Sequence, residues 1–411
     1  MFNYILVLVL IALIFGYKLF LNILSKKSSF RPIPENLSDI YSEVEYKKWQ
    51  EYHKKSIRLE IIELIVKYLV LFILFSFKLY ALFSSLFKDN LVMQTLAVVL
   101  FSFIVDEVFG IWFDYYKTMV LDKEYGLSVT KIGTFIGDQI KDLVIGFGVT
   151  FGLVLLFGAL HMLLGNWILV VFSGVLAIMV LVFTIFLPTF MRIYYRCDDL
   201  EEGELRTKVM ELLEKNGYKV RKIGVMNQSK RSTTGNAMFI GMGKFKTIIL
   251  YDTIIEQLTT DEIVAVFAHE VGHGKHRDGV RSYLISFTSV IVFVLIAWGL
   301  ANYNSLFTDF GFGGVNYGFI AIILSEVIIE LLAPIRDLLV NGLVRKEEYQ
   351  ADNFACINGY GEALATALKK MSNSNMANLN PHPLLVKIKY SHPTMSDRLT
   401  NIYNQINKEK V

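Results

Sequence analysis

FAHEVGHGKH, residues 267–276, is the stretch from which both the fold and the chemistry of this chain can be worked out. It places His269 and His273 four residues apart, so on a helix both imidazoles stand on one face, one turn from each other. Two such rings can bind one metal ion, while Glu270 between them reaches an attacking water. The TTDE pattern at 259–262 is a capping box before an apolar run, which predicts a helix start. The stretch therefore predicts a zinc site on a helix, as in zinc hydrolases.

The third metal ligand must come from elsewhere, because a catalytic zinc site has three protein ligands and one open position. The segment RKEEYQADNFA, residues 345–355, offers Glu348 and Asp352 four apart on an expected helix. One of these carboxylates can bind the metal while the other orients a ligating histidine. Glu347 competes for the ligand role, although it lies about 100° around the helix from Glu348. The chain has only two cysteines, so we expect no thiolate ligand and no disulfide framework.

Two further segments are of interest. In SHPTMSDRL, residues 391–399, His392 stands before a proline. It could donate to the oxyanion when water attacks a carbonyl, or could be a turn histidine without a catalytic part.

After an amphipathic helix, the sequence predicts a strand at 220–226 and a hairpin, NAMFIG and KTIILYD, joined by MGKF at 242–245. An edge strand beside a metal helix can pair with the substrate backbone. Residues 236–240 could serve in this way or form a plain structural hairpin.

The composition indicates a membrane protein. The hydrophobic fraction is 54% and the charged fraction 19%, against roughly 45–50% and 25% in soluble domains. The formal net charge of +3, without a basic stripe, argues against a nucleic-acid partner. We expect the lipid bilayer and a peptide or protein substrate as partners. Seven apolar segments are long enough to cross a bilayer: 4–24, 59–86, 91–113, 143–164, 167–190, 283–303 and 317–339.

Seven crossings would put the two termini on opposite sides of the membrane. The first and third loops are rich in basic residues, whereas the loops on the other side hold Lys88 alone. The positive-inside rule then places the N-terminus outside or in a lumen and the C-terminus in the cytoplasm. We expect four parts: a five-span region at 1–191, a zinc-peptidase part at 192–281, two further spans at 282–339, and the rest of the peptidase at 340–411.

Several expected spans contain ionisable residues, which either pair between packed helices or line a polar lumen. These residues are Lys67, Asp106, Glu107, His161, Glu326, Glu330 and Arg336.

Together, these motifs resemble the integral-membrane zinc metalloproteases of the CAAX prenyl protease (Ste24-like) type in peptidase family M48. SKRSTTGNAMF, KTIILYDTI, HEVGH, EYQADNFA and SHPTMSDRL occur in the order typical of that family. The resemblance implies a mainly α fold, in which a seven-helix transmembrane bundle encloses a chamber and carries a small cytoplasmic α+β zinc-peptidase domain. It also implies one Zn²⁺ per chain, bound by His269, His273 and Glu348, with Glu270 as general base.

For the remaining site residues, the resemblance implies that Asn236 and His392 contact the substrate carbonyl or oxyanion and that Asp352 supports a ligating histidine. Arg398 matches an arginine of the family, in a structural ion pair or in substrate binding. The implied reaction removes the last three residues of a prenylated CAAX protein, in a bacterial inner membrane or the endoplasmic reticulum.

Two alternative functions are compatible with parts of the sequence. A general quality-control protease of the membrane would use the same catalytic residues. A non-enzymatic transporter or channel could hold a structural zinc, but structural zinc usually takes four protein ligands, and the motifs supply three.

Overall fold

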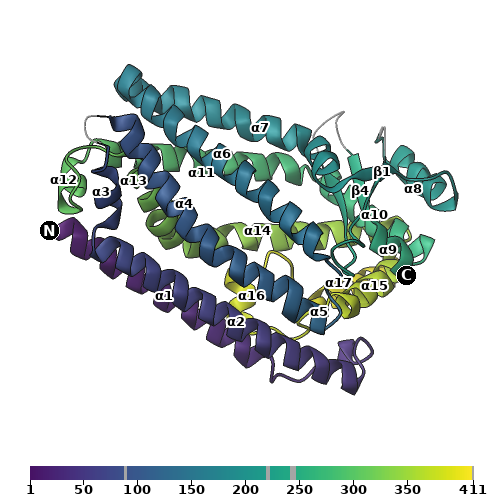
Figure 1. The fold of residues 1–411 in the computed structure, drawn as a ribbon. Helices are drawn as coiled ribbons and strands as arrows, with labels where there is room; N and C mark the ends of the chain where they lie inside the picture. The colour runs from purple at the N-terminus through teal and green to yellow at the C-terminus, as the bar shows by residue number, and fades with distance from the viewer. Residues whose placement is uncertain (88–89, 219–222, 241–246, 410–411) are drawn as a thin grey trace.

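The structure is a computed structural model, and it describes residues 1–87, 90–218, 223–240 and 247–409 (Figure 1). The chain is mainly helical. Within the described residues, five helical stretches are long and apolar enough to cross a membrane. They are Phe2–Ser28, Leu91–Glu124, Ile132–Arg192, Asp278–Ala301 and Tyr317–Ile357.

Three of the expected segments depart from these five stretches. α6 (Ile132–Leu164) and α7 (Ile168–Tyr195) are joined by a short 3₁₀ turn, so two expected spans fall in one stretch of 61 residues, Ile132–Arg192. α2 (Glu43–Ser76) carries most of the expected span 59–86 but is not among the five, since Glu60, Glu63 and Lys67 interrupt its apolar half.

The prediction that this second span continues to residue 86 is wrong. Lys78 has a left-handed backbone conformation, with φ of 53°, which ends α2 at Ser76 and turns the chain into the short helix α3 (Leu79–Ser84). Two further long helices of the bundle are α1 (Phe2–Ser28) and α4 (Leu91–Tyr115). α4 passes through a π-helical segment, Tyr116–Leu121, into α5 (Asp122–Glu124).

The last apolar helix continues into the peptidase part of the chain. α13 (Tyr317–Ile322) passes through a π-helical segment, Ile323–Ile329, into α14 (Glu330–Ile357), which holds the EYQADNFA motif. α11 (Asp278–Ala301) likewise begins three residues after the end of α10 (Thr260–Lys275). The expected boundaries at 281/282 and 339/340 thus fall inside continuous helices, and the four-part division stays a prediction.

A small sheet lies at one end of the bundle. Its strands run in the order β1 (Cys197–Asp199), β2 (Ile223–Met226), β4 (Thr247–Tyr251) and β3 (Ala237–Ile240). β2 and β4 are parallel, whereas β1–β2 and β3–β4 are antiparallel. The expected hairpin is therefore confirmed, with β3 at the sheet edge. The MGKF connection, and residues 220–222 of the expected strand, lie outside the described residues.

Four further helices share one buried core with this sheet and α10. They are α8 (Glu204–Lys215), α9 (Asp252–Gln257), α15 (Gly361–Ser374) and α17 (Met395–Glu409). The short helix α16 (Pro383–Lys389) connects this end of the molecule to α1 and α14.

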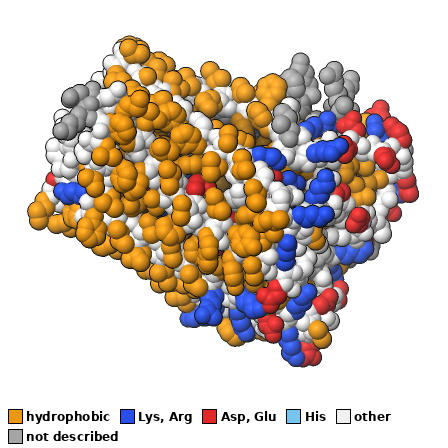
Figure 2. Space-filling view, in the orientation of Figure 1, with side chains coloured by type: hydrophobic (Ala, Val, Ile, Leu, Met, Phe, Trp, Pro, Cys, Tyr) orange, Lys and Arg blue, Asp and Glu red, His pale blue; other side chains and the backbone are white. Residues whose placement is uncertain are grey.

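The two ends of the molecule differ in character. The N-terminus lies beside α12 (Asn304–Asp309) at one end, where Asn3 contacts Asp309, and the C-terminus lies with the sheet at the other (Figure 1). Hydrophobic side chains cover the bundle surface, while acidic and basic side chains gather around the sheet end (Figure 2). This is the surface of a multi-pass membrane protein.

Candidate metal centre

The HEVGH sequence lies on α10, whose start matches the sequence prediction. Thr259 caps the helix: its hydroxyl accepts from Glu262 N at 3.4 Å, and the Glu262 carboxylate accepts from Thr259 N at 2.8 Å. The apolar run after the cap, Ile263 to Ala268, is buried in the core. The buried first half of the helix thus fixes the position of the two histidines in its second half.

A glycine allows the metal helix to approach α14 closely. A Cβ atom on Gly272 would lie 2.9 Å from Ala351 Cα, which is a backbone atom and cannot move aside easily. α10 and α14 therefore cross at Gly272 and Ala351. This crossing places Glu348, one turn before Ala351, opposite His269 and His273.

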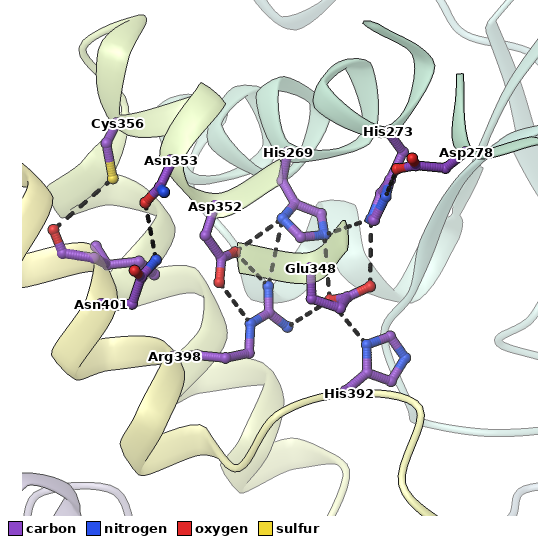
Figure 3. Close-up of polar contacts among 11 residues, drawn as sticks. His269, His273, Asp278, Glu348, Asp352, Asn353, Cys356, His392, Arg398 and Asn401 are labelled. Carbon is purple, nitrogen blue, oxygen red and sulfur yellow. Dashed lines mark hydrogen bonds and ion pairs between the residues drawn. The ribbon is translucent and has the colours of Figure 1, made fainter. Parts of the chain in front are cut away.

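Three donor atoms converge at this crossing (Figure 3). The distance between the Nε2 atoms of His269 and His273 is 3.2 Å. The Glu348 carboxylate oxygens lie 3.3 Å from His273 Nε2 and 3.7 Å from His269 Nε2. In a tetrahedral zinc site with bonds of about 2.0–2.1 Å, the donor atoms lie about 3.3–3.4 Å apart. The cluster therefore fits a single zinc ion.

The other ring nitrogen of each histidine faces a carboxylate. His269 Nδ1 lies 2.9 Å from Asp352, and His273 Nδ1 lies 2.9 Å from Asp278. These contacts favour the tautomer with the proton on Nδ1, which leaves Nε2 free to bind metal. The sequence reasoning identified Asp352 but missed Asp278. Asp278 lies three residues beyond the end of the metal helix, at a spacing that no shared helical face predicts.

The electrostatics of the cluster favour a cation. Burial lowers the pKa of His273, but Glu348 and Asp278 raise it more, so the pKa is about 9 against an ordinary value of 6.5. A point in the protein that stabilises the positive form of an imidazole also attracts a divalent cation.

Arg398 and His392 complete the cluster. Arg398 is buried and donates to both oxygens of Asp352, at 2.6 and 3.0 Å, and it lies 3.5 Å from Glu348. Of the two roles considered for Arg398, this geometry favours the structural ion pair. His392 is largely exposed, and its Nδ1 lies 2.9 Å from the Glu348 carboxylate.

The remaining predicted residues lie around the cluster. Glu270 is half-buried on α10, between the two histidines. Asn236 is exposed just before β3, which packs beside α10, and its side chain accepts a hydrogen bond from Ala237 N at 2.8 Å. Glu347, the competitor for the ligand role, forms an ion pair with Arg281 instead.

The chain is similar to known proteins along most of its length. The family model described as peptidase family M48 matches residues 199–406, and the one described as CAAX prenyl protease N-terminal, five membrane helices, matches residues 22–192. CAAX prenyl protease 1 of Saccharomyces cerevisiae is 30% identical over 314 residues, which cover 72% of this chain and 69% of the relative. The homolog from Dictyostelium discoideum is 27% identical over 413 residues, 95% of this chain and 94% of the relative.

The match to the probable CAAX prenyl protease 1 of Schizosaccharomyces pombe, 28% identical, covers 71% of this chain but only 61% of that relative. Among solved structures, the crystal structure of S. mikatae Ste24p superposes with a TM-score of 0.90 over 97% of this chain and 99% of that chain. Its sequence identity of 22% makes it a likeness of fold. The chain therefore belongs to peptidase family M48, as a membrane metalloprotease of the CAAX prenyl protease type.

Proposed function

We propose that this protein is a zinc endopeptidase that removes the last three residues of prenylated CAAX proteins. The observation that supports it most strongly is the convergence of His269, His273 and Glu348 at the separations of a tetrahedral zinc site. The names of the relatives indicate the substrate class.

In this proposal each residue around the metal centre has a separate task. Zinc, when bound by the two histidines and Glu348, supplies a Lewis acid that activates water and polarises the scissile carbonyl. Glu270 accepts the proton of the attacking water and passes it to the leaving amine. Asn236 and His392 donate to the carbonyl oxygen as negative charge develops there.

A second group of residues holds the ligands in place. Asp352 and Asp278 accept from the Nδ1–H groups of His269 and His273, and Arg398 neutralises Asp352. β3 is a sheet edge beside the metal helix, and it would align the substrate by pairing with its backbone.

The architecture that we propose is a bundle of seven membrane helices around a chamber, with the sheet and its helices as a cytoplasmic α+β zinc-peptidase domain. The five apolar stretches give seven helices if Ile132–Arg192 is counted as two and α2 is added. An odd number of crossings fits termini at opposite ends of the molecule (Figure 1). In this arrangement the N-terminus is outside or lumenal and the C-terminus is cytoplasmic.

The direct test is Glu270→Gln in the purified protein. We expect zinc content close to one ion per chain, as in the wild type, with hydrolysis of a farnesylated CAAX peptide reduced by about 100- to 10,000-fold, because the general base is lost. Glu214→Gln, at an exposed position on α8, is the matched control and should leave both measurements unchanged. A fully active Glu270→Gln protein would overturn the proposal.

A chelator and a second peptide test the metal and the substrate class. Removing zinc should abolish cleavage, and adding it back should restore cleavage. Equal rates on the farnesylated peptide and its unprenylated twin would contradict the prenyl part of the proposal and leave the zinc peptidase in place.

A further inference from the structure

A cavity of about 600 Å³ lies between α11 and α14 and reaches the metal centre. Its metal end is lined by His273, Asp278 and Glu347. Beyond that end its walls are formed by one face of each helix, including Ser286, Ser289, Val290 and Phe293 on α11 and Val340 and Val344 on α14.

The shape and lining of this cavity fit an elongated, uncharged chain. Along α14, the lining extends from Glu347 back to Arg336, which is about 16 Å at a rise of 1.5 Å per residue. Between these two charged ends, the lining consists of aliphatic, aromatic and serine side chains. The volume lies within the range of about 300–1,000 Å³ that is usual for small-molecule sites.

The cavity also connects the membrane with the metal centre, because α11 and α14 both belong to stretches that can cross a bilayer. Two other cavities of the bundle are also lined by such stretches, but they do not reach the metal centre. One lies beside Lys18 and Lys67 and the other beside Lys67 and Asp106, and neither is lined by His269, His273 or Glu348.

We propose that the cavity between α11 and α14 is a lipid slot that holds the isoprenoid chain of the substrate during cleavage. The inference rests on the proposed function, since it takes a prenylated cysteine immediately before the scissile bond. In such a substrate, the carbonyl under attack is bonded to the Cα of the cysteine, and the thioether sulfur is only two bonds beyond that Cα. The chain must therefore start within one side-chain length of the metal centre. His273 is both a candidate ligand and part of the slot wall, which meets this requirement.

Two neighbouring hydroxyl residues provide a matched test of the slot. Ser289 and Thr288 both donate to a backbone carbonyl four residues earlier on α11, at 3.0 and 2.9 Å. Ser289 lines the slot, whereas Thr288 is exposed and absent from its lining. Ser289→Phe should therefore fill the slot, and Thr288→Phe should add the same ring outside it.

We expect Ser289→Phe to lower kcat/KM for a farnesylated peptide by about tenfold or more, because losing the space of one or two methylene groups already has an effect of this size. Its kcat/KM for the unprenylated twin should stay at the wild-type value. Thr288→Phe should change neither rate. Equal losses on both peptides, or no loss on either, would overturn the proposal.

A labelling experiment makes the test independent of catalysis. The assay uses the inactive Glu270→Gln protein in a Cys197→Ser background, because Cys197 is a partly exposed thiol. In this background Ser289→Cys should react with a maleimide. S-farnesylcysteine methyl ester should slow that reaction by about tenfold at saturation, whereas S-methylcysteine methyl ester should not. Equal protection by a phospholipid would assign the slot to acyl chains of the bilayer and overturn the isoprenoid assignment. A wild-type protein that cleaves neither peptide would contradict the proposed function, whereas protection in this assay would still support the slot.

Discussion

At the scale of single residues, the metal centre shows which contacts a sequence pattern can reveal. His269, Glu270 and His273 could be identified because helical spacing fixes which side chains share a face. Asp278 could not, because Arg277 between the two helices has a left-handed backbone with φ of 59°, and this turn brings Asp278 back to His273. A spacing of five residues across such a turn has no regular counterpart on a helix.

Asp278 provides the first prediction at this scale. In Asp278→Asn, the side chain no longer carries the charge that holds the His273 tautomer, so zinc affinity should fall by about 10- to 100-fold. Competition with a zinc-binding dye would measure this change. Asp261→Asn, at an exposed position in the first turn of α10, should leave zinc affinity unchanged. Wild-type affinity in Asp278→Asn would show that the contact does not support the metal.

Gly272 provides the second residue prediction. In Gly272→Ala, the added methyl group would lie 2.9 Å from Ala351 Cα, so α10 and α14 must move apart and Glu348 must leave its position opposite the histidines. We expect most of the bound zinc to be lost on dialysis, as measured by atomic emission. Gly299→Ala, which meets no atom within 4 Å, is the control on a neighbouring helix. Full zinc retention in Gly272→Ala would mean that the crossing can relax without moving Glu348.

At the scale of elements, helix starts were easier to predict from the sequence than helix ends. The capping box before α10 is a local pattern, and the structure has it at Thr259 and Glu262. The continuation of the last apolar helix through Glu348 was not predictable from hydropathy, which changes near Val340 although the backbone hydrogen bonds continue. Hydropathy marks where a helix leaves the apolar environment, whereas a helix ends only where its backbone turns.

The capping box gives a prediction of stability. Burial raises the pKa of Glu262, but Lys370 and the Thr259 backbone lower it more, so its pKa in the folded protein lies below 4.5. A lowered carboxylate pKa contributes stability above the unfolded-state pKa, and this contribution is lost as the pH falls through the folded-state pKa. Glu262→Gln should therefore cost about 1 kcal/mol at pH 7, with a smaller difference from the wild type below about pH 4.

Thermal unfolding of the detergent-purified protein at several pH values would measure this difference. Glu256→Gln, an exposed position on the preceding helix, serves as the control. A constant difference between Glu262→Gln and the wild type at all pH values would contradict a role for the ionised carboxylate.

At the scale of the whole molecule, composition and span length were sufficient to predict a membrane protein, and the order of the motifs was sufficient to predict its family. The sequence could not show that α11 and α14 leave a cavity between them near the metal centre, because helix spacing depends on packing between distant segments. It also could not show that Asn3 would meet Asp309 at the end opposite the sheet. Such contacts join residues that no local pattern relates.

The arrangement of the termini leads to a prediction of membrane sidedness. Thr308 is exposed at the end that holds the N-terminus, and Asn404 is exposed on α17 at the sheet end. The basic loops 26–58 and 117–141 favour the cytoplasm for the sheet end. In a Cys197→Ser background, Asn404→Cys should react with a membrane-impermeant maleimide only from the cytoplasmic side of sealed vesicles, and Thr308→Cys only from the opposite side. Labelling of both positions from one side would require an even number of crossings between Thr308 and Asn404, where the seven-helix arrangement has one, and would overturn that arrangement.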